Sequence, residues 1–395
     1  MITLYESKDK CCGCSACQSI CPTNAIQMIS DGDGFLYPHV QKDKCIECEM
    51  CIKTCVFKST RSNEKTPINA YAAINKDKEV LINSSSGGVF GAVATKVLEK
   101  NGVVFGCSMN GKYEANHVYI TNLNQLKALQ GSKYIQSNIG ESYKKVKEYL
   151  NSDKKVLFSG TPCQVDGLKS YLKIDYDNLI TTDIICHGVP SPKFFKDYMN
   201  YLERKENLRI LKFNFRDTDI NYMSCAGKIT YIKGKKVCQR KMTYHLDCFY
   251  NYFMYGVIFR ECCYKCPYTN GNRPGDLTMG DYWGVQNYHP EIKTDKGVSA
   301  LLVNTQKGVD LVSELNLDII NTNFNNILNH NSNLVHPTPM NKDRDSVFKL
   351  YRESGIEAVV DNFYRKLGFK YYYYYIKNMI PISTKRRLKK ILRRE

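Results

Sequence analysis

The chain has 395 residues, enough for two or three domains of roughly 100–200 residues each with a sizeable buried core. Its formal charge is +17, it contains 18 cysteines, and no apolar run approaches the roughly 20 residues of a membrane span. The first residues do not form a basic segment followed by an apolar one, so we expect no secretory signal and a reducing, cytoplasmic environment. These features exclude a disulfide scaffold and a membrane-spanning protein, and they indicate metal ligation by cysteine.

Eight of the cysteines form two runs with the same C-x2-C-x2-C-x3-C spacing. The runs are Cys11, Cys14, Cys17, Cys21 and Cys45, Cys48, Cys51, Cys55. Bacterial ferredoxins hold two [4Fe–4S] clusters in this way, and each fourth cysteine ligates the cluster of the other run. We therefore expect one cluster on Cys11, Cys14, Cys17 and Cys55, and another on Cys45, Cys48, Cys51 and Cys21. Zinc and disulfides are the alternatives, and zinc is disfavoured because it needs fewer closely spaced thiolates than each run supplies.

This dicluster module is predicted to span residues 1–58. Between the cysteine runs, residues 25–29 and 35–40 flank Asp31-Gly32-Asp33-Gly34, which predicts a β-hairpin. The polar stretch 58–66, closed by Pro67, predicts a linker.

Beyond the linker, segments typical of strands and helices alternate. The predicted strands are 69–74, 103–105, 155–158 and 179–186, and the predicted helices are 89–100, 162–172 and 191–205. This alternation predicts an α/β core. Residues 211–215 and 228–242 predict an added antiparallel hairpin, and the chain beyond about residue 307 is predicted to be mainly helical.

Four further cysteines stand at positions where sites assemble in α/β folds. Cys163 lies at a strand-to-helix turn, Cys186 ends a predicted strand, and Cys263 and Cys266 form a C-x2-C pair. Together they could complete another [4Fe–4S] cluster. The alternatives are ordinary packed thiols, and half of a zinc site for the pair. The remaining cysteines, among them Cys12, Cys107 and Cys262, are expected to be packed thiols.

Six segments in order resemble the coenzyme F-420 hydrogenase/dehydrogenase beta subunit family, in its bacterial form with a fused dicluster ferredoxin. They are Ser85–Gly88, Gln130–Tyr134, Gly160–Gln164, Cys186–Gly188, Cys263–Cys266 and Arg273–Gly284. The resemblance covers about residues 1–305 and implies FAD beside a [4Fe–4S] cluster held by Cys163, Cys186, Cys263 and Cys266. Cys262 is a neighbouring alternative, but only Cys263 gives C-x2-C spacing with Cys266.

The resemblance also implies an α+β fold in which the ferredoxin module is fused to an α/β flavin-binding domain. Residues 67–150 would form the N-terminal part of that domain, 151–305 the C-terminal part with the flavin and third cluster, and 306–395 a helical basic tail. The expected flavin contacts are Ser85, Ser86, Gly87, Gly88, Ser132, Lys133, Tyr134, Gly160, Thr161, Asp276 and Asp281.

Physical arguments accompany these contacts. Backbone NH groups at Ser86-Gly87-Gly88, which open a helix, are suited to a flavin phosphate or ring oxygen, and glycine permits close approach. Lys133 would supply positive charge to an anionic flavin. The alternatives are ordinary helix capping for the glycine pair, a solvated surface lysine, and turn capping for Asp276 and Asp281. His187 is either a proton donor or a packed neighbour of Cys186, and no catalytic residue is predicted.

The function that these features favour is that of an iron–sulfur flavoprotein oxidoreductase. Electrons would pass between the ferredoxin-type clusters and a flavin that reduces or oxidises a two-electron carrier or small substrate. The candidate partners are a redox protein or soluble electron carrier, together with the deazaflavin coenzyme, a nicotinamide or a modified sugar. The alternative is a non-catalytic electron-transfer subunit of a larger redox complex. Nucleic-acid binding is not expected, because no recognition motif gathers the basic residues.

The C-terminal end combines tyrosines at 371–375 with a basic segment, 385–394, that contains Leu388, Ile391 and Leu392. This pattern favours a solvated or subunit-docking helix. The alternative is weak contact with an anionic membrane surface, which would place the protein at the inner face of a membrane. Each [4Fe–4S] cube with four thiolates contributes a charge of −2, so three cubes would lower the net charge from +17 to about +11.

Overall fold

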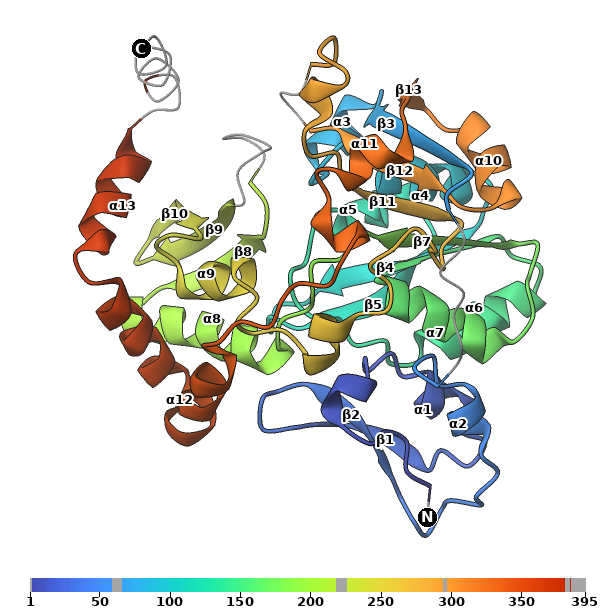
Figure 1. The fold of residues 1–395 in the computed structure, drawn as a ribbon, viewed down its shortest axis with the longest axis horizontal. Coiled ribbons are helices and arrows are strands. Elements are labelled where there is room, and N and C mark those ends of the chain that lie inside the picture. The colour runs from blue at the N-terminus through green and yellow to red at the C-terminus, as the bar shows by residue number, and fades with distance from the viewer. Residues whose placement is uncertain (1, 59–65, 218–225, 294–296, 381–383, 385–395) are drawn as a thin grey trace.

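The computed structural model describes residues 2–58, 66–217, 226–293, 297–380 and 384 (Figure 1). Most of the predicted linker, Cys225 and the basic segment 385–394 lie outside the described residues. The N-terminal module consists of α1 (Ala16–Ile20), β1 (Ile26–Ser30), β2 (Leu36–Val40) and α2 (Met50–Lys53). The predicted hairpin is confirmed, because β1 and β2 pair antiparallel from Ile26 opposite Val40 to Ser30 opposite Leu36.

An eight-stranded mixed sheet forms the centre of the molecule, in the order β13-β3-β12-β11-β7-β6-β4-β5. Its strands are β3 (Asn69–Asn75), β4 (Val103–Met109), β5 (Ala115–Ile120), β6 (Val156–Gly160), β7 (Leu179–Ile184), β11 (Leu277–Asp281), β12 (Ser299–Val303) and β13 (Leu317–Asn321). The four neighbours β4, β6, β7 and β11 run parallel, whereas β5 and β12 flank them in the antiparallel sense. The carboxyl ends of the four parallel strands therefore meet at one edge of the sheet.

Helices cover both faces of this sheet, as its apolar strands require. The cluster of buried side chains on one face involves α4 (Val89–Glu99) and α10 (Gln306–Ser313). The cluster on the other face involves α6 (Ser142–Asn151) and α7 (Pro162–Leu172). Residues 103–105 of β4 are all buried, which is typical of parallel strands enclosed on two sides. Ala16 of α1 belongs to the core of α6 and α7, so the N-terminal module packs directly on this face.

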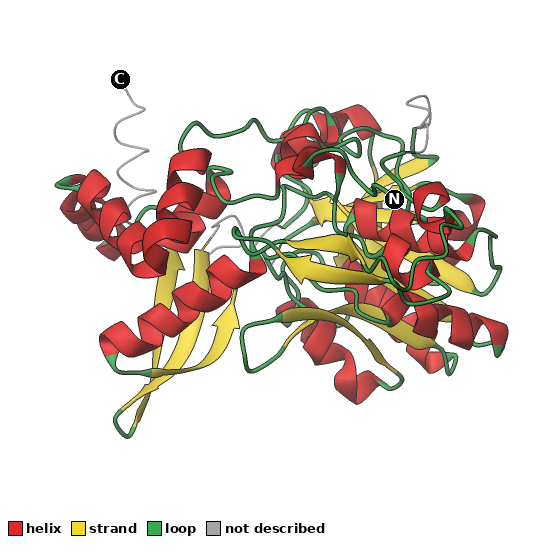
Figure 2. Cartoon of the chain, turned by 90° about the horizontal axis from the view of Figure 1, so that it is seen from below, coloured by secondary structure: helices red, strands yellow, loops and turns green. Residues whose placement is uncertain are grey.

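A second lobe lies beside the central sheet (Figure 2). Its antiparallel sheet contains β8 (Arg209–Asn214), β9 (Ala226–Lys233) and β10 (Lys236–Thr243). Helices α8 (Pro192–Glu206), α9 (Cys248–Met254) and α12 (Arg344–Leu367) share one apolar core with this sheet. The predicted hairpin is confirmed as β9 and β10, and β8 extends it. Phe35 and Tyr37 of the N-terminal module are part of the same core.

Several strands of the central sheet were not predicted. They are β5, β11, β12 and β13, and β13 lies within the region that was expected to be mainly helical. Strands of five residues such as β12 and β13 are too short for their apolar pattern to separate strand from helix. The remaining helices are α3 (Lys78–Ile82), α5 (Leu126–Leu129), α11 (Phe324–Leu328) and α13 (Lys370–Met379). No helix in the described ranges is long and apolar enough to cross a bilayer.

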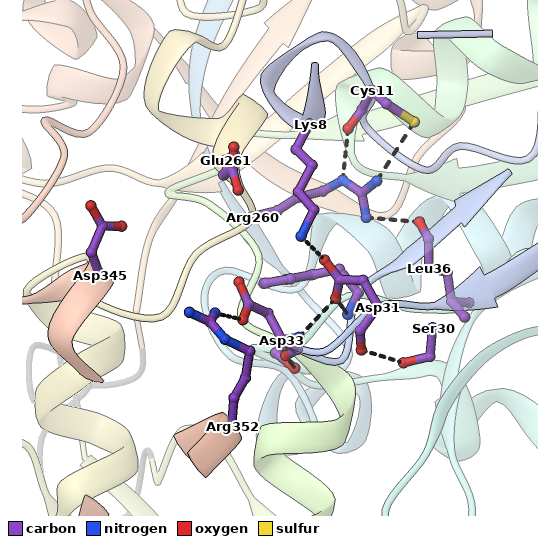
Figure 3. A network of polar contacts seen from close by, with 12 residues as sticks. Lys8, Cys11, Ser30, Asp31, Asp33, Leu36, Arg260, Glu261, Asp345 and Arg352 are labelled. Atoms are coloured by element: carbon purple, nitrogen blue, oxygen red, sulfur yellow. Dashed lines mark hydrogen bonds and ion pairs between the residues drawn. The ribbon is translucent and has the colours of Figure 1, made fainter. Parts of the chain in front are cut away.

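Arg260 joins the N-terminal module to the rest of the chain (Figure 3). Its side chain is fully buried and donates hydrogen bonds to the Cys11 carbonyl (Nε, 2.7 Å) and the Leu36 carbonyl (Nη1, 3.0 Å). It also donates to Gln136 Oε1 (3.1 Å) and to Cys11 Sγ (3.6 Å), and its guanidinium carbon lies 3.9 Å from the centroid of the Tyr37 ring. A buried guanidinium is costly unless its donors are satisfied, so these contacts hold the module in one orientation.

A second contact between the module and the lobe is ionic. Asp33, in the hairpin turn, pairs with Arg352 of α12 (Figure 3), and Arg344 of the same helix lies 3.9 Å from the other Asp33 oxygen. The Arg352 side chain is 45% exposed, so solvent screens this pair more than it screens Arg260.

Candidate functional site

Four cysteines from distant parts of the chain line one cavity, which we call the cysteine cavity. They are Cys163, Cys186, Cys263 and Cys266, the set predicted for a third cluster. Cys163 begins α7 directly after β6, and Cys186 follows the end of β7. Because β6 and β7 are adjacent and parallel, their carboxyl ends bring these two cysteines to the same edge. The loop after β10 and α9 supplies the other two.

The chemistry of the cysteine cavity fits an iron–sulfur cluster. Burial raises the pKa of the Cys186 thiol well above its ordinary value, and the facing thiols of Cys263 and Cys266 raise it further. Burial likewise raises the pKa of Cys266 to about 12, with Cys263 adding to the effect. Four buried thiolates would therefore need bound cationic charge, which cluster iron supplies.

No group of three or more His, Cys, Asp or Glu side chains among the described residues is arranged to hold a metal ion. A [4Fe–4S] cube places its four thiolates on separate irons, so its ligands stand further apart than those of one tetrahedral zinc.

Two further cysteines, expected to be packed thiols, also line the cysteine cavity. Cys12 and Cys262 are buried and pack together with Val56. Cys14 and Cys163 pack against the same cluster. The first cysteine run of the N-terminal module therefore lies directly against the cysteine cavity. Cys262 contacts its neighbour Cys263, so both candidates for this ligand position face the same space.

The N-terminal cysteines are grouped across the two runs. Cys21, Cys45, Cys48 and Cys51 line one cavity, which is the set predicted for the second cluster. For the other set, burial raises the pKa of Cys17, and the nearby Cys11 and Cys55 raise it further. Cys14 lies against α7, where a Cβ built on Gly167 would be 3.0 Å from Cys14 Sγ.

The two groups differ in their position relative to the body of the protein. The group that contains Cys11 and Cys14 faces Arg260 and α7, whereas the Cys48 side of the second group is exposed.

A larger cavity of about 610 Å³ opens at the carboxyl ends of β4, β6, β7 and β11. We call it the large cavity. It shares Cys186 and His187 with the cysteine cavity, so the two spaces have a common wall. Nine of the eleven predicted flavin contacts line it, namely Ser85, Ser86, Gly88, Ser132, Lys133, Tyr134, Gly160, Thr161 and Asp281. Its size and its place at the edge of a parallel sheet are typical of a cofactor site.

Gly87 and Asp276 do not line the large cavity. A Cβ on Gly87 would lie 2.1 Å from the Ala73 carbonyl oxygen and 2.6 Å from the Ser299 backbone nitrogen, so the absent side chain lets the loop pack on β3 and β12. Asp276 accepts hydrogen bonds from the backbone and hydroxyl of Thr181 (2.8 and 2.7 Å) and from the Thr305 hydroxyl (2.8 Å). Both residues support the sheet near the cavity.

The loop before α4 is tied to the 130–134 segment. Ser132 donates its backbone NH to Ser85 Oγ at 2.8 Å, which joins two motifs that are remote in sequence. Gly88 occupies the N-cap of α4 with φ +80°, a backbone conformation that favours glycine. The side-chain Nδ2 of Asn75 donates a hydrogen bond to the Gly88 carbonyl oxygen at 3.1 Å. The first turn of α4 therefore begins at the wall of the large cavity.

Lys133 is not the solvated lysine of the alternative interpretation. Its Nζ donates to the carbonyls of Leu129 (2.9 Å) and Gln130 (2.8 Å), at the C-terminal end of α5. Burial lowers its pKa to about 8, and Cys107 nearby acts in the opposite direction. The Lys133 ammonium group thus lies at the cavity wall, and it donates hydrogen bonds to backbone carbonyls at the end of α5.

A polar network that was not predicted also lines the large cavity. His117 Nε2 lies 3.0 Å from the Ser159 carbonyl oxygen, and Nδ1 lies 3.0 Å from Ser137 Oγ, which accepts from Gln164 Nε2 at 3.0 Å. A carbonyl only accepts, so Nε2 carries the proton and Ser137 donates to Nδ1. Burial lowers the pKa of His117 to about 4, which keeps the ring neutral. Gln164 belongs to a motif of the resemblance, but His117 lies on β5, which was not predicted.

Asp281 lines the large cavity as an ion-paired residue. Its carboxylate pairs with Arg216, and the Arg216 guanidinium carbon lies 5.2 Å from the centroid of the Trp283 ring. Arg216 was not predicted, because no local pattern marks a lone arginine after β8.

Comparison with known proteins agrees with this architecture. Residues 10–59 match the 4Fe-4S dicluster domain, which defines an iron–sulfur redox protein. Residues 153–323 match the family described as the C terminus of the coenzyme F420 hydrogenase/dehydrogenase beta subunit. The chain therefore carries the C-terminal domain of this oxidoreductase family behind an N-terminal dicluster domain, and the resemblance seen in its motifs is confirmed.

A solved structure also matches, that of the F420-reducing [NiFe] hydrogenase complex from Methanosarcina barkeri, derivatised with xenon. The identity is 14% and the TM-score 0.44, over 79% of this chain and 97% of that one. No curated protein matches the chain.

The packing role of Gly87 leads to a first prediction. Gly87→Ala should lower the free energy of unfolding by about 1–3 kcal/mol or more, because the new Cβ meets backbone atoms that cannot rotate away. Thermal unfolding of protein without added flavin is the measurement. Gly111→Ala is the matched control, since a Cβ there meets nothing within 4 Å. Equal unfolding temperatures for the two variants would contradict the packing role.

The buried His117 predicts a dependence of stability on pH. Its folded pKa of about 4 lies below the unfolded value of about 6.5, so its stabilising contribution is complete above pH 6.5 and is lost as the pH falls toward 4. One unit below the unfolded pKa, the loss should reach about 1.4 kcal/mol. Chemical unfolding at pH 7.5 and pH 5.5 measures this loss. His117→Gln should reduce the difference, whereas a variant of the exposed His336 should not.

Proposed function

We propose that this protein is a flavin-dependent iron–sulfur oxidoreductase. It would exchange single electrons through three [4Fe–4S] clusters and electron pairs through FAD, with a two-electron carrier or small molecule as substrate. The observation that carries this proposal is the common wall of the cysteine cavity and the large cavity, which includes Cys186, His187 and Thr161. Neighbouring sites of this kind suit a cluster beside a flavin.

The proposed cluster ligands follow the observed grouping of the thiols. Cys11, Cys14, Cys17 and Cys55 would hold the first cluster, and Cys21, Cys45, Cys48 and Cys51 the second. Cys163, Cys186, Cys263 and Cys266 would hold the third. The shared cavities of the last two sets and the mutual electrostatic effect of Cys11, Cys17 and Cys55 support these assignments.

Residues around the large cavity would bind and orient the flavin. The backbone NH groups at the start of α4, next to Gly88, are suited to an anionic or carbonyl oxygen. Lys133 would contribute positive charge near the cofactor, and bound FAD would supply the conversion between one-electron and two-electron transfer. The network of His117, Ser137 and Gln164 would hold one wall in a single hydrogen-bonding arrangement, because each of its members has a defined partner.

A redox protein or soluble carrier would exchange electrons at the outer edge of the N-terminal module. Cys48 is exposed there, and the neighbouring Ile46 is 64% exposed, which offers an apolar contact beside the second cluster. A cytoplasmic location is supported by the number of thiols that must stay reduced.

Anaerobic purification followed by iron, sulfide and flavin analysis tests the proposal. We expect about twelve irons and one FAD per chain, from four irons in each of three cubes. Cys186→Ser should lose about four irons, whereas Cys238→Ser, a change on β10 away from both cavities, should lose none. An iron content of about eight per chain in the unmodified protein would contradict the third cluster. Protein that contains iron but binds no flavin would instead support the role of a non-catalytic electron-transfer subunit.

Arg260 should set the reduction potential of the first cluster. A hydrogen bond to the Cys11 sulfur and a buried positive charge both favour the reduced state, so Arg260→Met should lower the midpoint potential of the first cluster most. The third cluster should shift less, because Arg260 also acts electrostatically on Cys263, and the second should stay unchanged. Redox titration followed by electron paramagnetic resonance measures this shift. Arg352→Met is the control, since Arg352 also contacts the module but pairs with Asp33. The same shift in both variants would assign the effect to docking of the module.

A further inference from the structure

Helix α13 carries an apolar stripe that no part of the described chain covers. Phe369, at its N-cap, is 93% exposed, Tyr372 is 65% exposed, Tyr373 is 60% exposed and Ile376 is 61% exposed. These residues are spaced i, i+3, i+4 and i+7, so they lie on one face of the helix. Single exposed apolar residues are normal on soluble proteins, but a contiguous stripe of large ones marks an interaction surface.

The opposite face of α13 is attached to the second lobe, which fixes the direction of the stripe. The Tyr374 ring stacks on His245 with centroids 4.2 Å apart and an interplanar angle of 4°. Asn378 Nδ2 donates to Thr243 Oγ1 at 3.0 Å. The exposed stripe therefore faces away from the protein, and Figure 1 shows α13 at the outer rim, beyond α12.

The charge next to the stripe is positive. Lys370 and Lys377 are both exposed and lie seven residues apart, on one flank of the stripe. Helix α13 contains no acidic residue. In the sequence, the segment 385–394 continues with seven lysines and arginines and no acidic residue. A covering partner should therefore be apolar at its centre and anionic at its edge.

We propose that α13 lies in the headgroup region of an anionic lipid bilayer, with its stripe inserted and its lysines beside the lipid phosphates. Tyrosine is enriched at membrane interfaces, and a helix with an aromatic face and basic flanks is typical of interfacial binding. Anionic lipids attract each nearby basic residue, which complements Lys370 and Lys377. A second copy of the chain fits less well, because symmetric pairing of α13 would bring lysines of like charge together.

This inference goes beyond the proposed redox function and does not depend on it. It would place the protein at a membrane surface through a helix that the structure describes. It adds the exposed Phe369 and Ile376 to the tyrosines at 371–375, which the sequence pattern had singled out together with the basic segment. The attached face of α13 keeps the second lobe close to the lipid, so membrane contact would also set the orientation of the body.

Co-sedimentation of the full-length, anaerobically purified protein with vesicles tests the inference. We expect the protein to pellet with phosphatidylglycerol–phosphatidylcholine vesicles at about 0.1 M salt, where screening is moderate, and to remain in solution with phosphatidylcholine alone. The triple variant Phe369→Ser, Tyr372→Ser, Ile376→Ser should bind at least about tenfold more weakly, since three inserted side chains are lost. Val237→Ser, which removes an isolated side chain of 66% exposure on β10, should bind like the unmodified protein. Unchanged circular dichroism and iron content show that each variant is folded.

Three results would overturn the inference. The first is an unmodified protein that stays in solution with anionic vesicles. The second is a triple variant that pellets as strongly as the unmodified protein, which would assign binding to another segment. The third is a dimer that forms without lipid and dissociates in the triple variant, as measured by size-exclusion chromatography, which would identify a second copy as the partner of the stripe.

Discussion

The arrangement of the whole molecule depends on one buried cation, the guanidinium of Arg260. It reaches Cys11 and Leu36 in the N-terminal module and Gln136 in the central domain, while the Tyr37 ring covers it. Removing such a group from water is unfavourable unless its donors find acceptors, so these contacts favour one orientation of the module. That orientation turns the first cysteine run toward the body of the protein and leaves Cys48 at its outer edge.

A second constraint comes from the parallel strands of the central sheet. Their carboxyl ends place Cys163 and Cys186 beside each other, and the loop that follows α9 brings Cys263 and Cys266 to the same space. The large cavity lies along the same edge and shares its wall with the cysteine cavity. Cluster chemistry and flavin chemistry would thus be neighbours because both use the ends of adjacent strands, where backbone groups are free to meet a ligand.

Residues within one motif divide between binding and support. Gly88 begins α4 at the cavity wall, whereas Gly87 lets the loop approach β3 and β12. Asp281 lines the cavity, while Asp276 is enclosed by hydrogen bonds from two threonines. Lys133 brings its charge to the wall with its donors already used by α5. Some residues of one motif therefore shape the site, whereas others line it and would contact a ligand.

The sequence by itself determined the features that depend on local spacing. Two identical cysteine runs, a turn of alternating Asp and Gly, and alternating strand and helix patterns predicted the dicluster module, its hairpin and the α/β core. The tertiary structure alone decided how separated segments meet, because a short strand such as β5 or β13 is defined by its partners in the sheet. His117 on β5, Arg216 after β8 and Arg260 carry no local signal, since their importance comes from neighbours far away in the chain. The exposed stripe of α13 likewise became visible only once the opposite face of the helix was seen to be attached.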